Sequence, residues 1–235
     1  IGKTAMDELA LGGTGLNGHL GMVHNPYGLE ENRISGGSSA GSAVAVAAGI
    51  VPFAIGSDTG DSVRKPASFC GIVGVKPTYG LCSRWGCVAF ASSLDTPGPI
   101  ARTVDDAAIL LSIMAGHDAK DSTSAPNASF KTDGDLKPLL GNGQKLRVGI
   151  IKEFNNVEIS TDMKALFEKR IADLKSLGAE IVEVSIPNIL DALAAYYIIA
   201  PAEASSNLAR YDGMRYGLRV DGIDLEDTYK KTRAA

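Results

Sequence analysis

The chain has 235 residues, of which 45% are hydrophobic and 21% are charged, and its formal net charge at pH 7 is -4. This length is enough for one sizeable core, and the negative charge argues against binding of nucleic acid through a broad basic surface. No apolar run approaches the roughly 18 residues that a membrane span requires, and no secretory leader opens the chain, so we expect a cytoplasmic protein without a membrane partner.

The first 50 residues predict a loop-rich start followed by a buried helix. Thr4–Ala10 could form a short helix, whereas Gly12–Arg33 is rich in glycine, asparagine and proline and is typical of a loop. From Ser39 to Gly49 the sequence is apolar on all sides, which predicts a helix that is buried all round. The short apolar run Pro52–Gly56 predicts an interior strand that leads into Asp58 and Ser62.

Two serine-bearing loops, Gly36–Ser42 and Gly56–Arg64, flank this apolar helix, so their serines could meet at one point. A catalytic serine needs a base to remove its proton and donors to stabilise the oxyanion. Glycines allow several backbone N–H groups to point at one spot, which serves the second need. We therefore interpret the two loops as a hydrolytic or acyl-transfer centre. For either loop alone, a simple turn before a helix is the alternative.

The second half of the chain predicts further α/β structure. Phe69–Val75 is a buried strand candidate, and Thr103 precedes a helix that Gly116 ends. Residues 117–144 are polar and predict a surface connection. The remaining elements are a strand at 146–151, a helix from Ser160 to Leu177, a strand at 180–184, a long apolar helix at 189–208 that Pro201 should kink or break, and a polar end from Arg210. Strand, helix and strand in this order predict a parallel βαβ unit.

The cysteines and histidines give no sign of a metal site. The chain has three cysteines and three histidines. Cys70, Cys82 and Cys87 form no CxxC pair, and His19, His24 and His117 are isolated from one another. We therefore interpret the cysteines as reduced small hydrophobic residues and expect no zinc site.

Three motifs together resemble the amidase signature family. They are Gly36-Gly37-Ser38-Ser39-x-Gly41-Ser42, then Gly56-Ser57-Asp58-Thr59-Gly60-x-Ser62-x-Arg64-x-Pro66-Ala67, and then the segment 74–80. The resemblance runs over nearly the whole chain. It implies an α/β fold in which helices cover both faces of a mixed central sheet. It also implies a single amidase-type domain over residues 1–235, truncated at both ends relative to the family.

The resemblance also implies roles for individual residues. Ser62 lies where the family has its nucleophile, and Ser38 where it has a bridging serine preceded by a cis peptide. The third member of the triad, a lysine in a Lys-Asp motif further upstream, has no match, and Lys3 is not that base. The remaining implied positions are the oxyanion hole, formed by the backbone amides of Thr59, Gly60, Asp61 and Ser62, and the substrate contacts Leu11, Gly12, Gly13 and Tyr196.

Asp61 departs from the family, which has glycine at this position. A carboxylate ~4 Å from a developing oxyanion would cost about 4 kcal/mol at an effective dielectric constant near 20. We therefore expect Asp61 to weaken turnover, unless it turns away and pairs with Arg64. Lys65 and Lys76 are the lysines nearest this loop and are candidates for a surrogate base, although a structural or solvated role is as consistent with their spacing.

Three functional hypotheses follow. Segments 92–95 and 203–213 are similar to the glutamine-hydrolysing subunits of tRNA-dependent amidotransferases. This resemblance implies hydrolysis of glutamine, transfer of ammonia to a B subunit that uses ATP and Mg²⁺, a small C subunit, and tRNA bound only through the partner. The chain's own chemistry would need no cofactor or metal. The alternatives are a stand-alone amidase and a catalytically silent α/β module, and the fragment alone is expected to be inactive.

Overall fold

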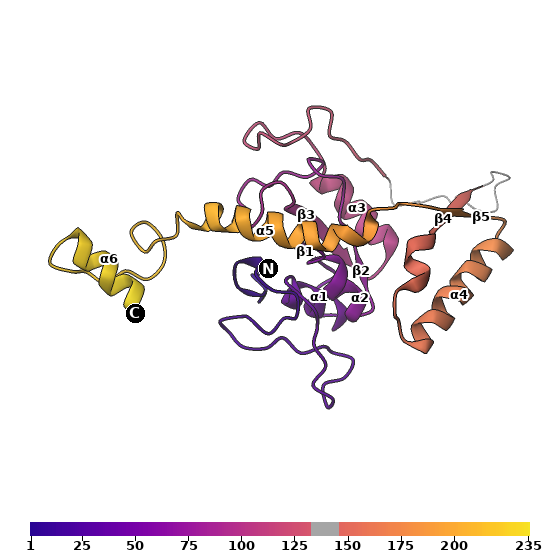
Figure 1. Ribbon diagram of the computed structural model, residues 1–235, viewed down its shortest axis with the longest axis horizontal. Helices are drawn as coiled ribbons and strands as arrows, with labels where there is room; N and C mark the ends of the chain where they lie inside the picture. The colour runs from indigo at the N-terminus through magenta and orange to yellow at the C-terminus, as the bar shows by residue number, and fades with distance from the viewer. Residues whose placement is uncertain (133–145) are drawn as a thin grey trace. The chain divides into compact units, whose positions relative to one another are not determined.

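The computed structural model describes residues 1–132 and 146–235, which form two compact units (Figure 1). The first unit comprises residues 1–132 and 198–235, and the second comprises residues 146–197. Each is described on its own below. That residues 1–235 constitute one amidase-type domain stays a prediction.

A three-stranded antiparallel sheet lies at the centre of the first unit, with the strand order β1-β3-β2. Strand β1 (Phe53–Asp58) pairs with β3 (Thr96–Ala101) along its full length, from Phe53 opposite Ala101 to Asp58 opposite Thr96. All six residues of β3 are buried, whereas Phe53 and Ile55 are exposed. Among the described strands β1 is therefore at an edge, which corrects the prediction of an interior strand at this position.

Strand β3 is central although it contains two prolines, Pro97 and Pro99, which lack the N–H that a sheet ladder needs. The carbonyl of Pro99 accepts the N–H of Val75, so this residue faces the side of β2 (Val73–Gly74). Because orientation alternates along a strand, Pro97 faces the same side and Gly98 faces β1. Only two residues of β2 pair with β3, opposite Ala101 and Ile100, so the prolines break no ladder bond.

Three helices pack against this sheet. Helix α1 (Ala40–Ala47) packs against β1, α2 (Arg64–Phe69) against β2, and α3 (Val104–Met114) against β3. Val46, Val63 and Ile100 form a fully buried cluster between them. The predicted helix after Ser39 is confirmed, but only part of it is buried. Helix α3 begins as predicted, because the Thr103 side chain accepts the Asp106 N–H.

Other predictions for the first unit require correction. Instead of a short helix over Thr4–Ala10, the chain forms one 3-10 turn, η1 (Glu8–Ala10), in which Leu9 and Ala10 have positive φ. Phe69–Val75 is not one strand, since α2 ends at Phe69 and β2 has two residues. The polar C-terminal stretch contains a helix, α6 (Leu225–Ala234), which the side chain of Asp224 caps.

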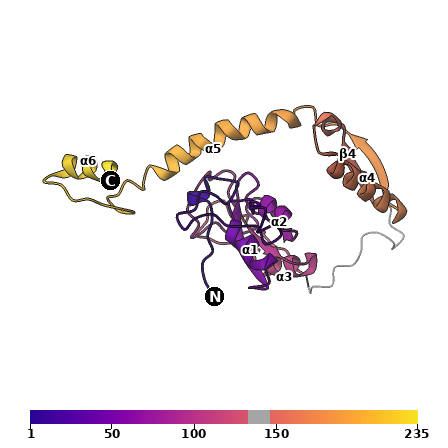
Figure 2. The same cartoon turned by 90° about the horizontal axis from the view of Figure 1, so that it is seen from below.

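The second unit contains the predicted βαβ arrangement. Strands β4 (Arg147–Ile151) and β5 (Glu180–Val184) are parallel, and α4 (Thr161–Ser176) connects them after the turn η2 (Lys152–Asn156). Helix α4 contacts β5 within this unit (Figure 2). The turn η3 (Ile189–Asp191) follows, and α5 (Ala192–Leu208) then runs through Pro201 as one helix, so the predicted break is absent.

The described part of the predicted surface connection folds back onto the first unit. Asp118 accepts the hydroxyl of Ser83 at 2.7 Å, and Asp121 accepts the N–H of Arg84 at 2.9 Å. The rest of the connection, from residue 133, lies outside the described residues.

No described helix has the length and apolar character that a bilayer crossing demands.

Candidate active site

The first serine loop presents a hydroxyl with no hydrogen-bond partner. Ser38 is fully buried and follows a cis Gly37–Ser38 peptide bond. Its carbonyl accepts the N–H of Asp7 at 3.1 Å, whereas its Oγ has no hydrogen-bond partner among the described residues. Buried hydroxyls are normally satisfied because an unmade hydrogen bond costs free energy. The free Oγ of Ser38 is therefore a candidate for chemistry.

The second serine loop is closed at its base by Asp58. This carboxylate is fully buried and accepts the N–H of Val63 at 3.0 Å, so the loop from Thr59 to Ser62 is bridged between its two ends. The Arg64 guanidinium reaches the same carboxylate, with Nε at 3.1 Å and one terminal nitrogen at 3.0 Å. This contact raises the pKa of Arg64. Asp58 thus fixes both the loop and the start of α2.

The two serine loops meet, as the sequence predicts. The N–H of Ser39 donates to the carbonyl of Ser62 at 3.1 Å, and the N–H of Ser57 donates to Oγ of Ser39 at 3.2 Å. Gly56 is required for this approach, because a Cβ on it would lie 2.5 Å from Oγ of Ser39. Ser62 itself is buried. The structure therefore joins the two loops through Ser39, the residue after Ser38, and Ser62, while the catalytic roles of Ser38 and Ser62 stay predictions.

Asp95 holds the other end of the second loop. Its Oδ1 accepts the hydroxyl of Thr59 at 2.6 Å and the N–H of Ala91 at 3.1 Å, and its Oδ2 accepts the N–H of Phe90 at 2.9 Å. Both Thr59 and Asp95 are buried. The side chain of Thr59 is thus turned to Asp95. The oxyanion-hole function of the loop amides stays a prediction.

Asp61 pairs with Lys65 and not with Arg64, which corrects the expected partner. Its Oδ2 lies 2.7 Å from Nζ of Lys65, one helical turn along the chain. Arg64 is instead engaged by the buried Asp58 and by the carbonyl of Gly60. Lys76, the other lysine considered as a base, is exposed.

The segment from Leu11 to Gly13, predicted to contact substrate, lies beside this ion pair. A Cβ on Gly13 would lie 2.7 Å from Nζ of Lys65. The turn that carries the segment is held by Asp7, which is fully buried and accepts the N–H of Thr14, Gly15 and Asn17. The N–H of Asp7 also donates to the carbonyl of Ser38, so it links the segment to the first serine loop.

Tyr196, the other predicted substrate contact, belongs to the second unit. Its ring meets that of Tyr197 edge to face, with 5.5 Å between the ring centroids. The contact between Tyr196 and substrate stays a prediction.

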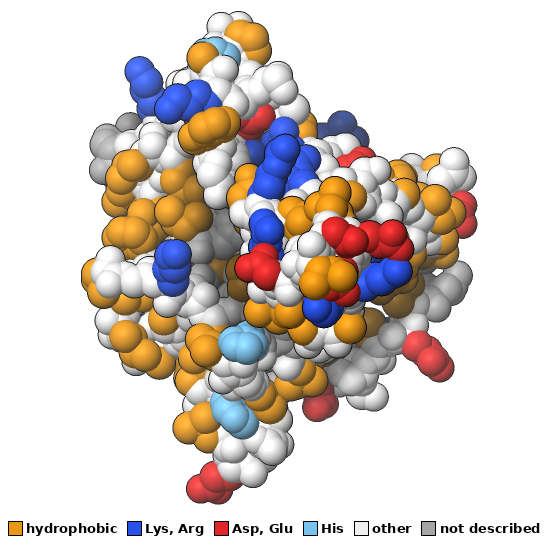
Figure 3. Space-filling view, turned by 90° about the vertical axis from the view of Figure 1, so that its left-hand side faces the viewer, with side chains coloured by type: hydrophobic (Ala, Val, Ile, Leu, Met, Phe, Trp, Pro, Cys, Tyr) orange, Lys and Arg blue, Asp and Glu red, His pale blue; other side chains and the backbone are white. Residues whose placement is uncertain are grey.

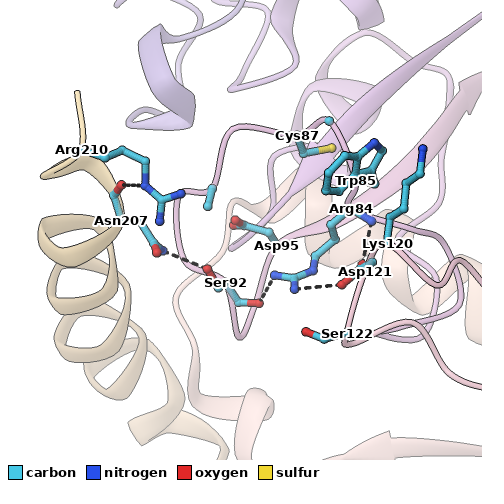
Figure 4. A pocket seen from close by; sticks show the side chains of 12 residues that line it. Arg84, Trp85, Cys87, Ser92, Asp95, Lys120, Asp121, Ser122, Asn207 and Arg210 are labelled. Carbon is cyan, nitrogen blue, oxygen red and sulfur yellow. Dashed lines mark hydrogen bonds and ion pairs between the residues drawn. The ribbon is translucent and has the colours of Figure 1, made fainter. Parts of the chain in front are cut away.

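A cavity of about 350 Å³ lies against the far side of Asp95 (Figure 4). Figure 4 shows it between the chain around Arg84 to Asp95 and the end of α5. The α5 wall is fixed by Asn207, whose amide donates to Oγ of Ser92 at 3.0 Å and to the carbonyl of Phe90 at 3.1 Å. The lining residues are Arg84, Trp85, Gly86, Cys87, Ala89, Ser92, Asp95, Lys120, Asp121, Ser122, Asn207 and Arg210.

Arg84 and Asp121 form the most extensively bonded ion pair of this cavity. Arg84 donates to Asp121 Oδ1 at 3.2 Å, to Oγ1 of Thr123 at 3.0 Å and to the carbonyl of Ser92. Burial alone would raise the pKa of Asp121, but the hydrogen bonds from Arg84 and Thr123 outweigh it and place that pKa well below its ordinary value. Sequence reasoning missed this pair, because Asp121 lies in a stretch that reads as a polar connection.

A family model and several curated proteins match the full length of the chain. Residues 1–235 match the family model described as Amidase. The chain is 53% identical over 239 residues to the glutamyl-tRNA(Gln) amidotransferase A subunit from Paramagnetospirillum magneticum, and 54% identical to the one from Rhizobium meliloti. These alignments cover 100% of the chain and 48% of each relative, so the chain spans about half the length of the curated relatives it matches.

Solved structures show the same fold. The glutamyl-tRNA(Gln) amidotransferase A subunit from Thermotoga maritima matches with a TM-score of 0.79 and 43% identity, over 93% of this chain and 46% of that protein. The peptide amidase of Stenotrophomonas maltophilia matches with a TM-score of 0.74 and 33% identity, over 93% of this chain and 45% of that protein. These matches confirm the predicted α/β amidase fold.

Proposed function

The chain belongs to the amidase family, and from this premise we propose that it is the central part of the glutaminase subunit of a tRNA-dependent amidotransferase. The observation that carries the proposal is the junction of the two serine loops, where Ser39 binds Ser62 and the Oγ of Ser38 has no partner among the described residues. The identity to glutamyl-tRNA(Gln) amidotransferase relatives over the whole chain supports this choice within the family.

In the proposed reaction, Oγ of Ser62 attacks the side-chain amide carbon of glutamine. The proton of Ser62 passes to Ser38, which gives its own hydroxyl proton to the leaving nitrogen as the C–N bond breaks and ammonia departs. The backbone N–H groups from Thr59 to Ser62 stabilise the oxyanion, which requires that they stay fixed in space. The anchors at Asp58, Asp95 and Ser39 support this rigidity. Water then releases glutamate from Ser62.

The family's lysine base has no match upstream of Ser38 in this sequence, so we propose that these 235 residues alone are inactive. Ammonia would pass to a B subunit that activates the misacylated tRNA with ATP and Mg²⁺, and a small C subunit would assist assembly. The formal net charge of -4 supports tRNA binding by a partner, and the one face shown in Figure 3 mixes acidic, basic and apolar side chains. The proposed compartment is the cytoplasm.

The test is ammonia release from glutamine by the full natural protein that contains this chain, with its partner subunits present. We expect Ser62→Ala to abolish release, because the acyl-enzyme cannot form. Ser112→Ala is the matched control, since the hydroxyl of Ser112 only donates to a carbonyl within α3. Ammonia release by Ser62→Ala at the wild-type rate would overturn the proposal.

A stand-alone amidase is the second candidate, and the fold shared with a peptide amidase favours it. Hydrolysis of small amides or peptide amides by the full protein without partners, at a rate above its glutaminase rate, would favour this candidate. The 235-residue chain assayed alone tests the third hypothesis, a catalytically silent module, for which we expect no release of ammonia.

A further inference from the structure

Asp61 and Lys65 form a geometrically defined pair at the edge of the proposed active site. The carboxylate and ammonium lie 2.7 Å apart, and the N–H of Lys65 donates to the carbonyl of Asp61 at 2.7 Å, so the turn that leads into α2 fixes the spacing. Residues four apart on a helical turn face the same side. The pair is therefore a consequence of backbone geometry and not of a chance side-chain contact.

The neighbouring cation cannot take the place of Lys65. Arg64 is held by Asp58, which is fully buried and would become an unpaired buried charge if Arg64 turned away. The two cations thus have separate partners: Arg64 closes the loop through Asp58, and Lys65 is left for Asp61.

The ammonium of Lys65 also lies against the proposed substrate segment. A Cβ on Gly13 would come within 2.7 Å of Nζ, so the absence of a side chain at Gly13 leaves the space that Lys65 occupies. The pair therefore connects the loop that carries Ser62 with the segment from Leu11 to Gly13.

The side chains of the pair remain partly exposed, at 45% for Asp61 and 32% for Lys65. Exposed ion pairs of this spacing contribute little to folding. Their effect on charge is larger, because an unpaired carboxylate beside a developing oxyanion opposes the transition state directly. A pair with little value for stability, placed at the loop of the proposed nucleophile, points to an electrostatic role.

We infer that Lys65 is a positioning residue that turns the Asp61 carboxylate away from the oxyanion and cancels its charge, so that the two side chains act as one neutral unit. This inference rests on the proposed function. It also revises the expected effect of Asp61, which slows turnover only when Lys65 is absent.

The experiment compares glutamine hydrolysis by the full natural protein and four variants: Lys65→Met, Lys65→Arg, Asp61→Gly, and Asp61→Gly with Lys65→Met. We expect Lys65→Met to lower kcat by about tenfold or more with a smaller change in KM, where tenfold corresponds to about 1.4 kcal/mol. Lys65→Arg keeps a cation opposite Asp61 and should stay within about threefold of wild type. Once Asp61 is replaced by glycine, loss of Lys65 should have no further effect, so the kcat of the double variant should equal that of Asp61→Gly to within about threefold.

Lys231→Met is the matched control, because Lys231 pairs with Asp227 at the same spacing, at 2.8 Å, on α6. Its kcat should equal that of wild type. Melting temperatures identify any variant that fails to fold, and Lys65→Gln then replaces Lys65→Met.

Two results would overturn the inference: wild-type kcat in Lys65→Met, or a double variant that is slower than Asp61→Gly by the same factor by which Lys65→Met is slower than wild type. The second result would mean that Lys65 acts independently of Asp61. Failure of the proposed function looks different, because ammonia release would then be absent from wild type or would survive Ser62→Ala.

Discussion

The hydroxyl of Thr59 donates to the carboxylate of Asp95 at 2.6 Å, in a buried contact that joins the loop of the proposed nucleophile to the chain 36 residues further on. This contact connects the loop with the cavity beside α5, because Asp95 also lines that cavity. A substitution of Asp95 should therefore loosen the loop that carries Ser62, although it removes no proposed catalytic group.

Asp95→Asn should lower the free energy of unfolding by about 1–3 kcal/mol, because an amide NH₂ would face one of the backbone donors that now meet a carboxylate oxygen. Thr59→Val, which removes only the hydroxyl, should cost about 1 kcal/mol. Urea unfolding of the two single variants and the double variant measures the coupling. Strict additivity would contradict a direct Thr59–Asp95 interaction.

Ser38→Ala should leave the stability of the 235-residue chain unchanged or raise it by up to about 1 kcal/mol, because the replaced hydroxyl is buried and has no partner among the described residues. Ser39→Ala is the control, and it should destabilise by about 1 kcal/mol because its Oγ accepts the N–H of Ser57. The melting temperatures of Ser38→Ala and Ser39→Ala, measured by thermal unfolding, test this expectation. A greater loss for Ser38→Ala than for Ser39→Ala would show that Oγ of Ser38 has a structural partner.

Asp121 should make the fold sensitive to acid. Its pKa in the folded protein lies below the unfolded value of about 3.9, so its stabilisation is fully present above pH 4 and is lost as the pH falls through the folded pKa. Asp121→Asn should reduce stability at pH 7 by about 3 kcal/mol, because Arg84 loses its charged partner. The difference between variant and wild type should shrink below pH 4. Urea midpoints between pH 2 and pH 7 measure this, and a constant difference would contradict the assignment.

Gly98→Ala should be strongly destabilising, by about 3 kcal/mol or more, because a Cβ would lie 2.0 Å from the backbone carbonyl oxygen of Val75. Gly2→Ala should have no comparable effect, since no atom lies within 4 Å of its added Cβ. Melting temperatures of the two variants test the close approach of β3 to the chain after β2. A Gly98→Ala protein as stable as wild type would show that this approach can relax.

The sequence was most informative where local chemistry determines local structure. The glycines and serines around Ser38 and Ser62 predict two turns on either side of an apolar helix, and the turns meet as expected. Thr103 and Ser160 begin their helices as capping residues should. In the second unit, the order of strand, helix and strand along the sequence is sufficient to predict a parallel βαβ arrangement.

Features that depend on distant partners could not be predicted. Strand β3 contains Pro97 and Pro99, which are rare in strands, and it is central because β1 pairs with it on one side and β2 on the other. The partner of Asp61 depends on the burial of Asp58, since this decides where Arg64 goes. Arg64 and Lys65 are adjacent in the sequence, so the sequence alone does not show which of them pairs with Asp61. The role of Asp121 likewise depends on Arg84, 37 residues earlier.

The prolines of β3 also bear on aggregation. A foreign strand that tries to grow the sheet on the β2 side would find no N–H at Pro97 or Pro99, so it could not complete an antiparallel ladder there. The opposite side of β3 is already taken by β1. Strand β3 is therefore a poor template for intermolecular pairing if the chain opens locally. Among the described strands, the outer edge of β1 is the longest edge of this sheet that is open to self-association.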